Sequence, residues 1–408
     1  MLPTHETLVA GLAELIAIPS VSADAAHAAD VLRAAEWIVA RIEAMGGTAS
    51  IELRNGVPLV VGAVKASAGR GSGATVLAYA HMDVQPPDPL DLWESDPWTL
   101  VERDGLLVAR GVADDKMHLF TLLEATRVLA EAGELPVDVR FVFDAEEEIG
   151  GHSVVDWVEE DAGPADVALI WDGGYVTQEL PSFCTALRGI CYFHLTVRTG
   201  ERDLHSGMYG GGALNAVHAL MRSVSGVLAG PDGRLPEPLR VGIIPPTADE
   251  IAGWEALPSG TEELVGAGAI AMDSGAADAF TLRTTSEPSA DVNGIEGGSP
   301  RLQKTVLPVE AQANLSVRLA PGQKSAEIAP VVERLLREAL PDGAELTVEL
   351  WSTGEPAWVD PTAPAVVLAR DAFEEVLGAR PVLARTGGSI REPSSINLST
   401  DSFVVTTR

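Results

Sequence analysis

Cysteine is scarce in this sequence of 408 residues, and so are basic side chains. The only two cysteines, Cys184 and Cys191, are too few for a disulfide framework or a cysteine-based metal site. We expect both to be small buried thiols. The chain has 28 Lys and Arg against 59 Asp and Glu, for a formal net charge of −31. Such a chain lacks the clustered cations that bind nucleic acid or an anionic membrane surface.

Long hydrophobic segments are also absent. No stretch approaches the roughly 18 uninterrupted apolar residues of a membrane-spanning helix. The N-terminus, Met1-Leu-Pro-Thr-His-Glu, has no basic region followed by an apolar core, so we expect no signal peptide and a cytoplasmic protein. The sequence is nevertheless 46% hydrophobic, which is enough for sizeable cores. Its length makes two domains the default expectation.

The first part of the chain alternates between helical and extended patterns. The expected helices cover 6–17, 28–45 and 116–132, and the expected strands cover 57–64, 75–82 and the apolar runs that begin at 137 and 166. Runs of five to eight residues rich in Val, Ile and Leu are typical of buried strands in an α/β sheet. The alternation predicts an α/β layered domain over 1–187.

The pattern then changes to that of a smaller α+β domain. Strands are expected near 191–198, 309–319 and 345–351, with helices from 212 and over 325–339. A stretch rich in Pro, Gly and acidic residues, 229–262, predicts loops with short helices. A helix over 361–378 returns to the first domain. We therefore expect an inserted domain over 188–356 and a second part of the first domain over 357–408.

Acidic residues and one histidine follow the apolar runs at the points where the strands should end. They are His81 and Asp83, the triplet Glu146-Glu147-Glu148, and Asp172, while Asp114 opens a helix. In α/β sheets, ligands bind at the carboxyl ends of the strands. Carboxylates gathered at one edge repel each other unless a cation lies between them. The joint pattern predicts a metal site.

Each cluster also has an ordinary structural interpretation when it is taken alone. His81 and Asp83 share one face of an extended segment, as a metal-binding His and its orienting carboxylate would, but a surface pair in a turn has the same spacing. Either Asp114 or Asp115 suits a helix N-cap, with the other as a ligand. Asp172 alone is an ordinary residue at a strand end. Oxygen-rich ligands with one His also suit Mg or Mn, so the donor set does not select zinc.

The glutamate triplet is the most informative of these clusters. A metal-dependent hydrolase needs one carboxylate as a ligand and another that is free to take a proton from metal-activated water. Adjacent glutamates supply both, and Gly150-Gly151 lets the backbone turn directly afterwards.

In the order and the residues of these motifs, the chain resembles the di-zinc aminopeptidase-like amidohydrolases from about residue 5 to 390. This family includes carnosinase-type dipeptidases, carboxypeptidase G, aminoacylase-1 and succinyl-diaminopimelate desuccinylase, and the resemblance is to the dipeptidase branch. It implies a zinc-peptidase-like α/β/α catalytic domain with an inserted α+β lid and dimerisation domain. It also implies two divalent metal ions, zinc with Mn or Co as alternatives, and a homodimer.

The resemblance assigns a role to each motif residue. His81, Asp114 and Asp172 would bind one metal, and Asp114 would bridge to a second metal that Glu148 also holds. Asp83 would orient the imidazole, and Glu147 would be the general base. Met117 stands where the family usually has Gly.

The inserted domain carries further matches to the family. The segment Asp203-Leu-His205-Ser-Gly resembles the one whose His reaches the partner subunit's site and polarises the scissile carbonyl; from the residues alone it is only a loop histidine. Thr305 and Arg318 would bind the substrate carboxylate, a task that suits the guanidinium fork. The run that contains Gly388 and Ser389 resembles a backbone contact to substrate.

The resemblance ends after Ile390. Family members continue with a strand, a helix and a His that completes the second metal site, whereas all eight histidines here lie at or before His218. This departure is typical of a frameshifted or truncated terminus and predicts a weaker second metal site. We expect metal-dependent hydrolysis of dipeptides. The alternatives are an N-acyl amino acid amidohydrolase of the same fold and an inactive relative that lacks the last ligand.

Overall fold

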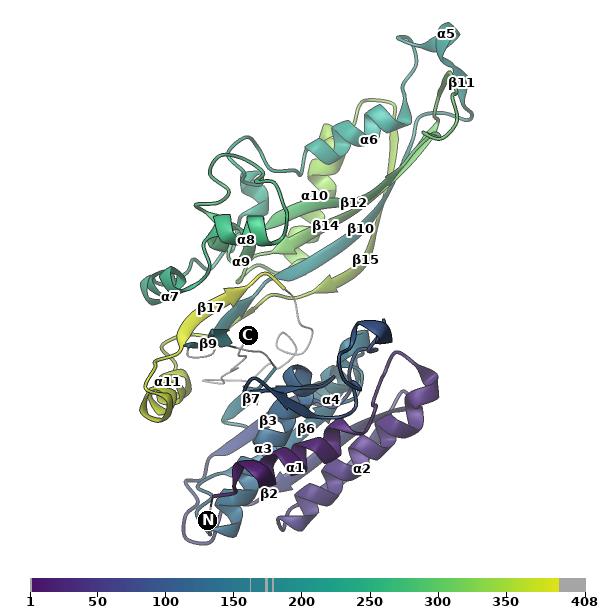
Figure 1. The fold of residues 1–408 in the computed structure, drawn as a ribbon. Helices are drawn as coiled ribbons and strands as arrows, with labels where there is room; N and C mark the ends of the chain where they lie inside the picture. Colours follow the sequence, from purple (N-terminus) through teal and green to yellow (C-terminus); the bar gives the residue numbers. More distant parts are fainter. Residues whose placement is uncertain (1, 162, 173–174, 178–179, 389–408) are drawn as a thin grey trace. The chain divides into compact units, whose positions relative to one another are not determined.

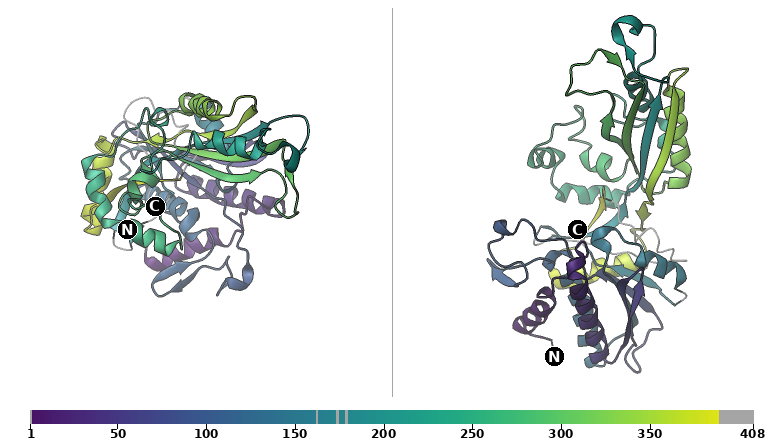
Figure 2. Two further views of the ribbon diagram at one scale, coloured as in Figure 1. Left: turned by 90° about the horizontal axis from the view of Figure 1, so that it is seen from above. Right: turned by 90° about the vertical axis from the view of Figure 1, so that its right-hand side faces the viewer.

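The computed structural model describes residues 2–161, 163–172, 175–177 and 180–388. These residues form two compact units (Figures 1 and 2). Unit 1 comprises 2–185 and 359–382, and unit 2 comprises 186–358 and 383–388.

Unit 1 is built on a five-stranded sheet with the order β1-β2-β6-β3-β7. Its strands are β1 (Thr48–Arg54), β2 (Val57–Val64), β3 (Thr75–His81), β6 (Asp138–Asp144) and β7 (Val167–Ile170). Strand β3 runs parallel to both β6 and β7, while β2 is antiparallel to β6 and β1 is antiparallel to β2. The carboxyl ends of β3, β6 and β7 therefore meet at one edge of the sheet.

Helices cover both faces of this sheet (Figure 1). They are α1 (His5–Ile16), α2 (Ala28–Ala44), α3 (Met117–Glu131) and α4 (Ser153–Glu160), and α11 (Pro364–Leu377) completes the unit. Successive residues of a strand face opposite ways. Ala78 and Ala80 of β3 thus pack with α2 and α3, while Leu77 and Tyr79 pack with α4. The predicted α/β fold class of the catalytic domain is confirmed.

Unit 2 contains an antiparallel sheet with the order β12-β14-β10-β15. Its elements are β10 (Gly189–Arg198), α6 (Ala216–Ser225), β12 (Ser289–Glu296), β14 (Glu310–Leu319), α10 (Ser325–Ala339) and β15 (Glu345–Gly354). Alternate residues of β10, such as Phe193 and Leu195, pack in one core with Leu220 of α6 and Val332 of α10. The two helices therefore cover one face of the sheet.

The connection between α6 and β12 consists of loops and short helices, as the sequence predicts. Its helices are α7 (Ala248–Gly253), α8 (Gly260–Gly266) and α9 (Phe280–Thr285). Capping boxes start α7 and α8 because Thr247 and Ser259 each exchange hydrogen bonds with a glutamate three residues later. A fully buried ion pair between Glu250 and Arg385, 2.9 Å, joins α7 to β17 (Val382–Thr386).

The remaining elements are short, apart from the eight-residue strand β9. They are β4 (Val101–Arg103), β5 (Leu106–Val108), β8 (Tyr175–Thr177), β9 (Leu180–Leu187), β11 (Leu204–His205), α5 (Ser206–Tyr209), β13 (Val306–Leu307), β16 (Ala357–Trp358) and single turns η1 (Ala25–His27), η2 (Leu90–Leu92), η3 (Val112–Lys116), η4 (Glu147–Ile149), η5 (Glu237–Leu239) and η6 (Trp254–Ala256). Both cysteines are buried thiols, as expected. Among the helices described here, none is long and apolar enough to cross a membrane.

Candidate metal centre

The segment that follows β3 is held on both sides by main-chain contacts. The N–H of Met82 donates to the carbonyl of Asp144 at 2.8 Å, and the N–H of Val84 donates to the carbonyl of Ser20 at 3.0 Å. The hydroxyl of Ser20 donates to the carbonyl of Met82 at 2.6 Å. His81 is fully buried at the end of this strand. Its imidazole is therefore fixed by the fold.

Three of the predicted ligands converge at the carboxyl edge of the sheet. Nε2 of His81 lies 2.9 Å from Oδ1 of Asp114 and 4.0 Å from Oδ2 of Asp172. One ligand atom from each lies within 4.8 Å of the other two. The Asp114 side chain is 57% exposed, so the group opens to solvent. An imidazole nitrogen and two carboxylate oxygens at these spacings fit a divalent cation.

The surroundings of His81 favour positive charge. Its Nδ1 lies 3.1 Å from the carbonyl oxygen of Asp83 and 3.3 Å from the Oδ1 of that residue. Burial acts to lower the pKa of His81, but the carboxylates of Asp114, Asp83 and Asp115 outweigh it and hold the pKa well above its ordinary value. A cation among these carboxylates is stabilised in the same way.

Glu148 lies beside this group but outside the set of three. Its carboxylate accepts hydrogen bonds from the main-chain N–H of Gln85 at 3.1 Å and from the Gln85 side-chain amide at 2.7 Å. Burial, and then the charge of Asp114, raise the pKa of Glu148. The carboxylates of Glu148 and Asp114 thus repel each other, which a shared cation would relieve. No sequence motif indicates the contact between Gln85 and Glu148.

The three glutamates of the triplet have different surroundings. Glu146 is buried, and its Oε1 accepts the N–H groups of His152 and Ser153 at 2.8 and 2.7 Å, which caps the start of α4. Glu147 is the partly buried first residue of η4. Glu146 therefore has a structural role in α4, whereas its two neighbours belong to the turn at the sheet edge.

Asp114 and Asp115 have separate roles, and neither caps α3. Lys116 occupies the N-cap of that helix and makes no capping hydrogen bond with its side chain, so the N-cap interpretation of Asp114 and Asp115 is wrong. The carboxylate of Asp115 is fully buried and accepts the His81 N–H at 3.0 Å, and its other oxygen is 2.5 Å from Nδ1 of His118. Burial raises the pKa of Asp115 to about 7.

Lys116 is buried, and its contacts stabilise the segment that carries Asp114. No sequence motif indicated this structural role. Its Nζ donates to the carbonyls of Leu15 and Ile18 at 3.1 and 2.5 Å, near the C-terminus of α1. Burial lowers the pKa of Lys116 to about 7. The lysine thus ties the segment that carries Asp114 to the end of α1.

The remaining predicted residues belong to unit 2. His205 is exposed, its Nδ1 accepts the N–H of Gly207 at 3.1 Å, and it pairs with Val306 in the β11–β13 ladder next to Thr305. Arg318 lies on β14. Gly388 donates its N–H to the Thr386 hydroxyl at 3.4 Å. Ser389 lies outside the described residues.

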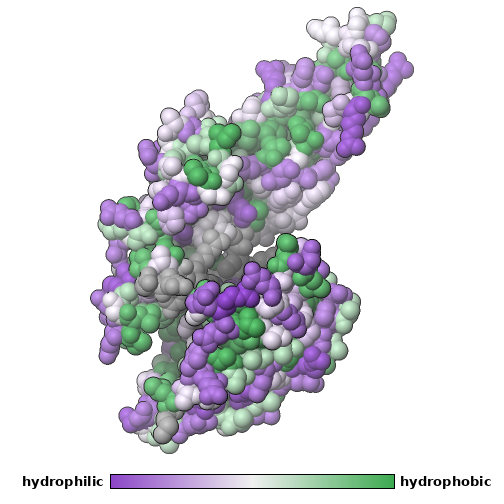
Figure 3. Space-filling view, in the orientation of Figure 1, coloured by the Kyte–Doolittle hydropathy of each residue, from purple (hydrophilic) through white to green (hydrophobic). Residues whose placement is uncertain are grey.

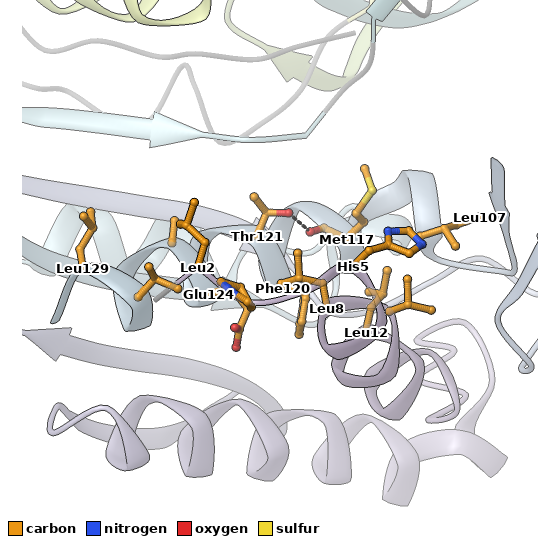
Figure 4. A pocket seen from close by; sticks show the side chains of 14 residues that line it. Leu2, His5, Leu8, Leu12, Leu107, Met117, Phe120, Thr121, Glu124 and Leu129 are labelled. Carbon is orange, nitrogen blue, oxygen red and sulfur yellow. Dashed lines mark hydrogen bonds between the residues drawn. The ribbon is translucent and has the colours of Figure 1, made fainter. Parts of the chain in front are cut away.

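A large groove of unit 1 has a different chemical character. It has a volume of about 640 Å³ and lies between α1 and α3. Figure 4 shows apolar side chains such as Leu8, Leu12 and Phe120 around it. Figure 3 shows hydrophobic patches between polar ones on the surface of this unit. With Glu124 as its only carboxylate, this groove does not provide a metal site.

The fold and the sheet-edge donors define a class of protein. A three-layer α/β/α unit that brings an imidazole and several carboxylates to the carboxyl ends of parallel strands is typical of a metal-dependent hydrolase. Residues 77–392 match the sequence model of peptidase family M20/M25/M40. The chain belongs to this family, in its dipeptidase branch, and is a metallopeptidase.

Known relatives agree with this placement. A cysteinylglycine-S-conjugate dipeptidase of Corynebacterium striatum is 32% identical over 404 residues, which cover 95% of this chain and 85% of that protein. The human β-Ala-His dipeptidase is 28% identical over 334 residues, covering 78% of this chain and 64% of that protein. The fold is similar to that of an M20 family metallo-carboxypeptidase from Sulfolobus solfataricus, with a TM-score of 0.77, 23% identity and coverage of 98% and 90%.

Proposed function

We propose that this protein hydrolyses dipeptides with the help of two divalent metal ions, most simply zinc. The convergence of His81, Asp114 and Asp172 carries the proposal, because these three donors fit a cation and a cation would offset the repulsion between the two carboxylates. The similarity to dipeptidases supports the substrate class. When bound, the metal ions would lower the pKa of water and polarise the scissile carbonyl.

The ligands divide between two positions in this proposal. His81, Asp114 and Asp172 would hold the first ion, and Asp114 and Glu148 would hold the second. The effect of the Asp114 charge on the pKa of Glu148 supports the shared position. Asp83 orients the imidazole of His81 through the contacts to Nδ1.

Glu147 is the general base. Its carboxylate takes a proton from the attacking water and passes it to the leaving amine. Two observations support this choice over its neighbours: Glu146 caps the start of α4, and the carboxylate of Glu148 accepts a hydrogen bond from the side-chain amide of Gln85.

Unit 2 supplies substrate recognition. Arg318 and Thr305 bind the C-terminal carboxylate of the substrate, with main-chain contacts from Gly388 and Ser389. His205 polarises the scissile carbonyl in the site of the partner subunit of a homodimer. The exposure of His205 supports a role toward another chain. The homodimer and the cytoplasmic location remain predictions.

The test is a substrate panel with metal-loaded protein. Cys-Gly, β-Ala-His and Gly-Leu represent dipeptides, and N-acetyl-leucine represents the N-acyl alternative. We expect turnover of at least one dipeptide that exceeds turnover of N-acetyl-leucine and requires added metal. Preferential hydrolysis of N-acetyl-leucine would overturn the dipeptidase assignment while keeping the metal-dependent chemistry.

A further inference from the structure

Unit 2 contains a cavity that the proposed reaction does not use. It has a volume of about 510 Å³ and lies between the connection from α6 to β12 and the beginning of β12. Small-molecule sites commonly have volumes of roughly 300–1,000 Å³. Its lining residues all fall between Arg188 and Asp291, so the whole cavity belongs to one unit. No residue of the candidate metal centre lines it.

Basic side chains are concentrated around this cavity. Four arginines and three acids line it, a surplus of one positive charge in a chain whose formal net charge is −31. The arginines are Arg188, Arg234, Arg240 and Arg283, and the acids are Asp232, Glu287 and Asp291. An anionic occupant is favoured where one of these arginines has no carboxylate partner.

Arg188 differs from the other three because it is buried without a carboxylate partner. The residue is 9% exposed. Nε donates to the carbonyl of Gly387 at 3.2 Å, and Nη1 donates to the carbonyl of Glu287 at 3.3 Å and to the hydroxyl of Ser289 at 3.2 Å. Across the described part of the chain, Nη2 has no hydrogen-bond partner and no carboxylate forms an ion pair with Arg188.

The nearby carboxylates are already engaged by the other arginines. Glu287 forms an ion pair with Arg240 and lies 3.8 Å from Arg234. Arg283 pairs with Asp273 at 2.5 Å. Arg188 therefore faces the cavity as a cation whose hydrogen-bond acceptors are all neutral.

Burying a cation in this way is costly. Burial lowers the pKa of Arg188 to about 10, and the positive charge of Arg318 adds to the effect. The negative charge of Asp291 acts to raise this pKa, but it offsets the effects of burial and Arg318 only in part. An anion bound at Nη2 would stabilise the guanidinium, because a buried charge costs much less when it is paired and hydrogen-bonded.

Apolar side chains also line the cavity. Leu264, Phe280 and Leu282 line it, and two large apolar side chains, Ile270 and Met272, also contribute. These two are 95% and 70% exposed in the described chain. These side chains would contact the apolar part of a bound ligand.

We propose that this cavity binds a small carboxylate with an apolar body. The carboxylate would lie at Nη2 of Arg188, near Arg234, and the apolar part would pack on Leu264, Phe280 and Ile270. A single negative charge fits better than a double one, because Asp232 and Asp291 also line the cavity.

The test uses 4-phenylbutyrate as the probe and 4-phenylbutan-1-ol as its neutral counterpart, with binding to the metal-loaded protein measured by calorimetry. We expect the acid to bind at least about tenfold more tightly than the alcohol, since a hydrogen bond to a charged group supplies a difference of this size. Equal affinity for the two probes, or no binding of the acid, would overturn the proposal.

Substitutions of residues that line the cavity test where the probe binds. Arg188→Gln and Arg234→Gln should each weaken binding of the acid, by about tenfold for Arg188, and Ile270→Ser should weaken binding of both probes. Arg198→Gln is the matched control, since Arg198 forms a half-exposed pair with Glu310 and does not line the cavity. If Arg188→Gln does not fold, the test rests on Arg234→Gln and Ile270→Ser. Unchanged affinity for 4-phenylbutyrate in both of these variants would contradict the proposal.

A last variant tests whether the probe binds in this cavity or at the metal centre. Asp114→Asn should leave 4-phenylbutyrate binding unchanged, whereas loss of binding would place the carboxylate at the metal and overturn the assignment. The measurement does not require turnover, so it succeeds or fails independently of the proposed dipeptidase activity.

Discussion

The carboxylate of Asp83 accepts a hydrogen bond from the main-chain N–H of Glu148 at 3.2 Å. Its other oxygen lies 3.3 Å from Nδ1 of His81. One buried side chain therefore connects the end of β3 with the turn after β6. The relative positions of the proposed ligands on these two segments depend on it.

Asp83→Asn should weaken metal binding. The substitution preserves the size of the side chain but removes the charge that orients His81, and changes of this kind typically cost ~10–100-fold in metal affinity. Titration with zinc against a chromogenic chelator measures the change. Asp91→Asn, at an exposed acid, is the control. Equal zinc affinity in the two variants would contradict the orienting role.

Glu147→Gln should separate catalysis from metal binding. Loss of a general base should reduce kcat by ~10²–10⁴-fold, while the metal content stays unchanged because Glu147 is not a ligand in our proposal. Glu146→Gln is the matched control one residue earlier; it retains a side-chain oxygen for the cap of α4 and should keep kcat near the native value. Reversed effects of the two substitutions would assign the base to Glu146.

The buried pair of Glu250 and Arg385 should contribute to stability. Both side chains are fully buried, so Glu250→Gln leaves an unpaired charge in the interior at a cost of about 3–5 kcal/mol in the free energy of unfolding. Urea denaturation measures it. Adding Arg385→Met to Glu250→Gln should recover part of the loss, since no buried charge then remains. A double variant less stable than Glu250→Gln alone would contradict this account.

The thiol of Cys191 should be unreactive, and its ionisation should lower the stability of the folded protein at alkaline pH. Burial raises the pKa of its thiol to about 12, so the folded protein keeps the proton to a higher pH than the unfolded chain, whose ordinary value is 9.0. This contribution is fully present below pH 9 and is lost as the pH rises toward 12. The stability difference between the native chain and Cys191→Ala should therefore shrink above pH 9. A constant difference up to pH 10.5 would contradict the raised pKa.

Most of the catalytic fold could be predicted because its strands are apolar and end in distinctive residues. The runs at β3, β6 and β7 have buried residues on both faces, so their composition indicated buried strands of an α/β sheet whose carboxyl ends share an edge. The edge strands β1 and β12 were missed. Several of their residues are exposed, and β12 includes Asn293 and Gly294, so neither has the apolar signal of a buried strand.

The details of the site depended on contacts between distant parts of the chain. Sequence spacing could not decide between Asp114 and Asp115, because both fit a helix start. The structure distinguishes them: the carboxylate of Asp115 accepts the main-chain N–H of His81 and lies beside His118, whereas Asp114 approaches the imidazole of His81. Lys116 contacts carbonyls about a hundred residues away, a pairing that no local pattern contains.

The most direct test of the central claim combines metal analysis with hydrolysis of Cys-Gly and β-Ala-His. The folded protein is stripped with a chelator, reloaded with zinc and compared with Glu147→Gln. We predict hydrolysis that disappears on stripping, returns with zinc and is lost in the variant although zinc remains bound. A folded, fully loaded protein that hydrolyses neither dipeptide, or that hydrolyses them equally well after stripping, would contradict the account.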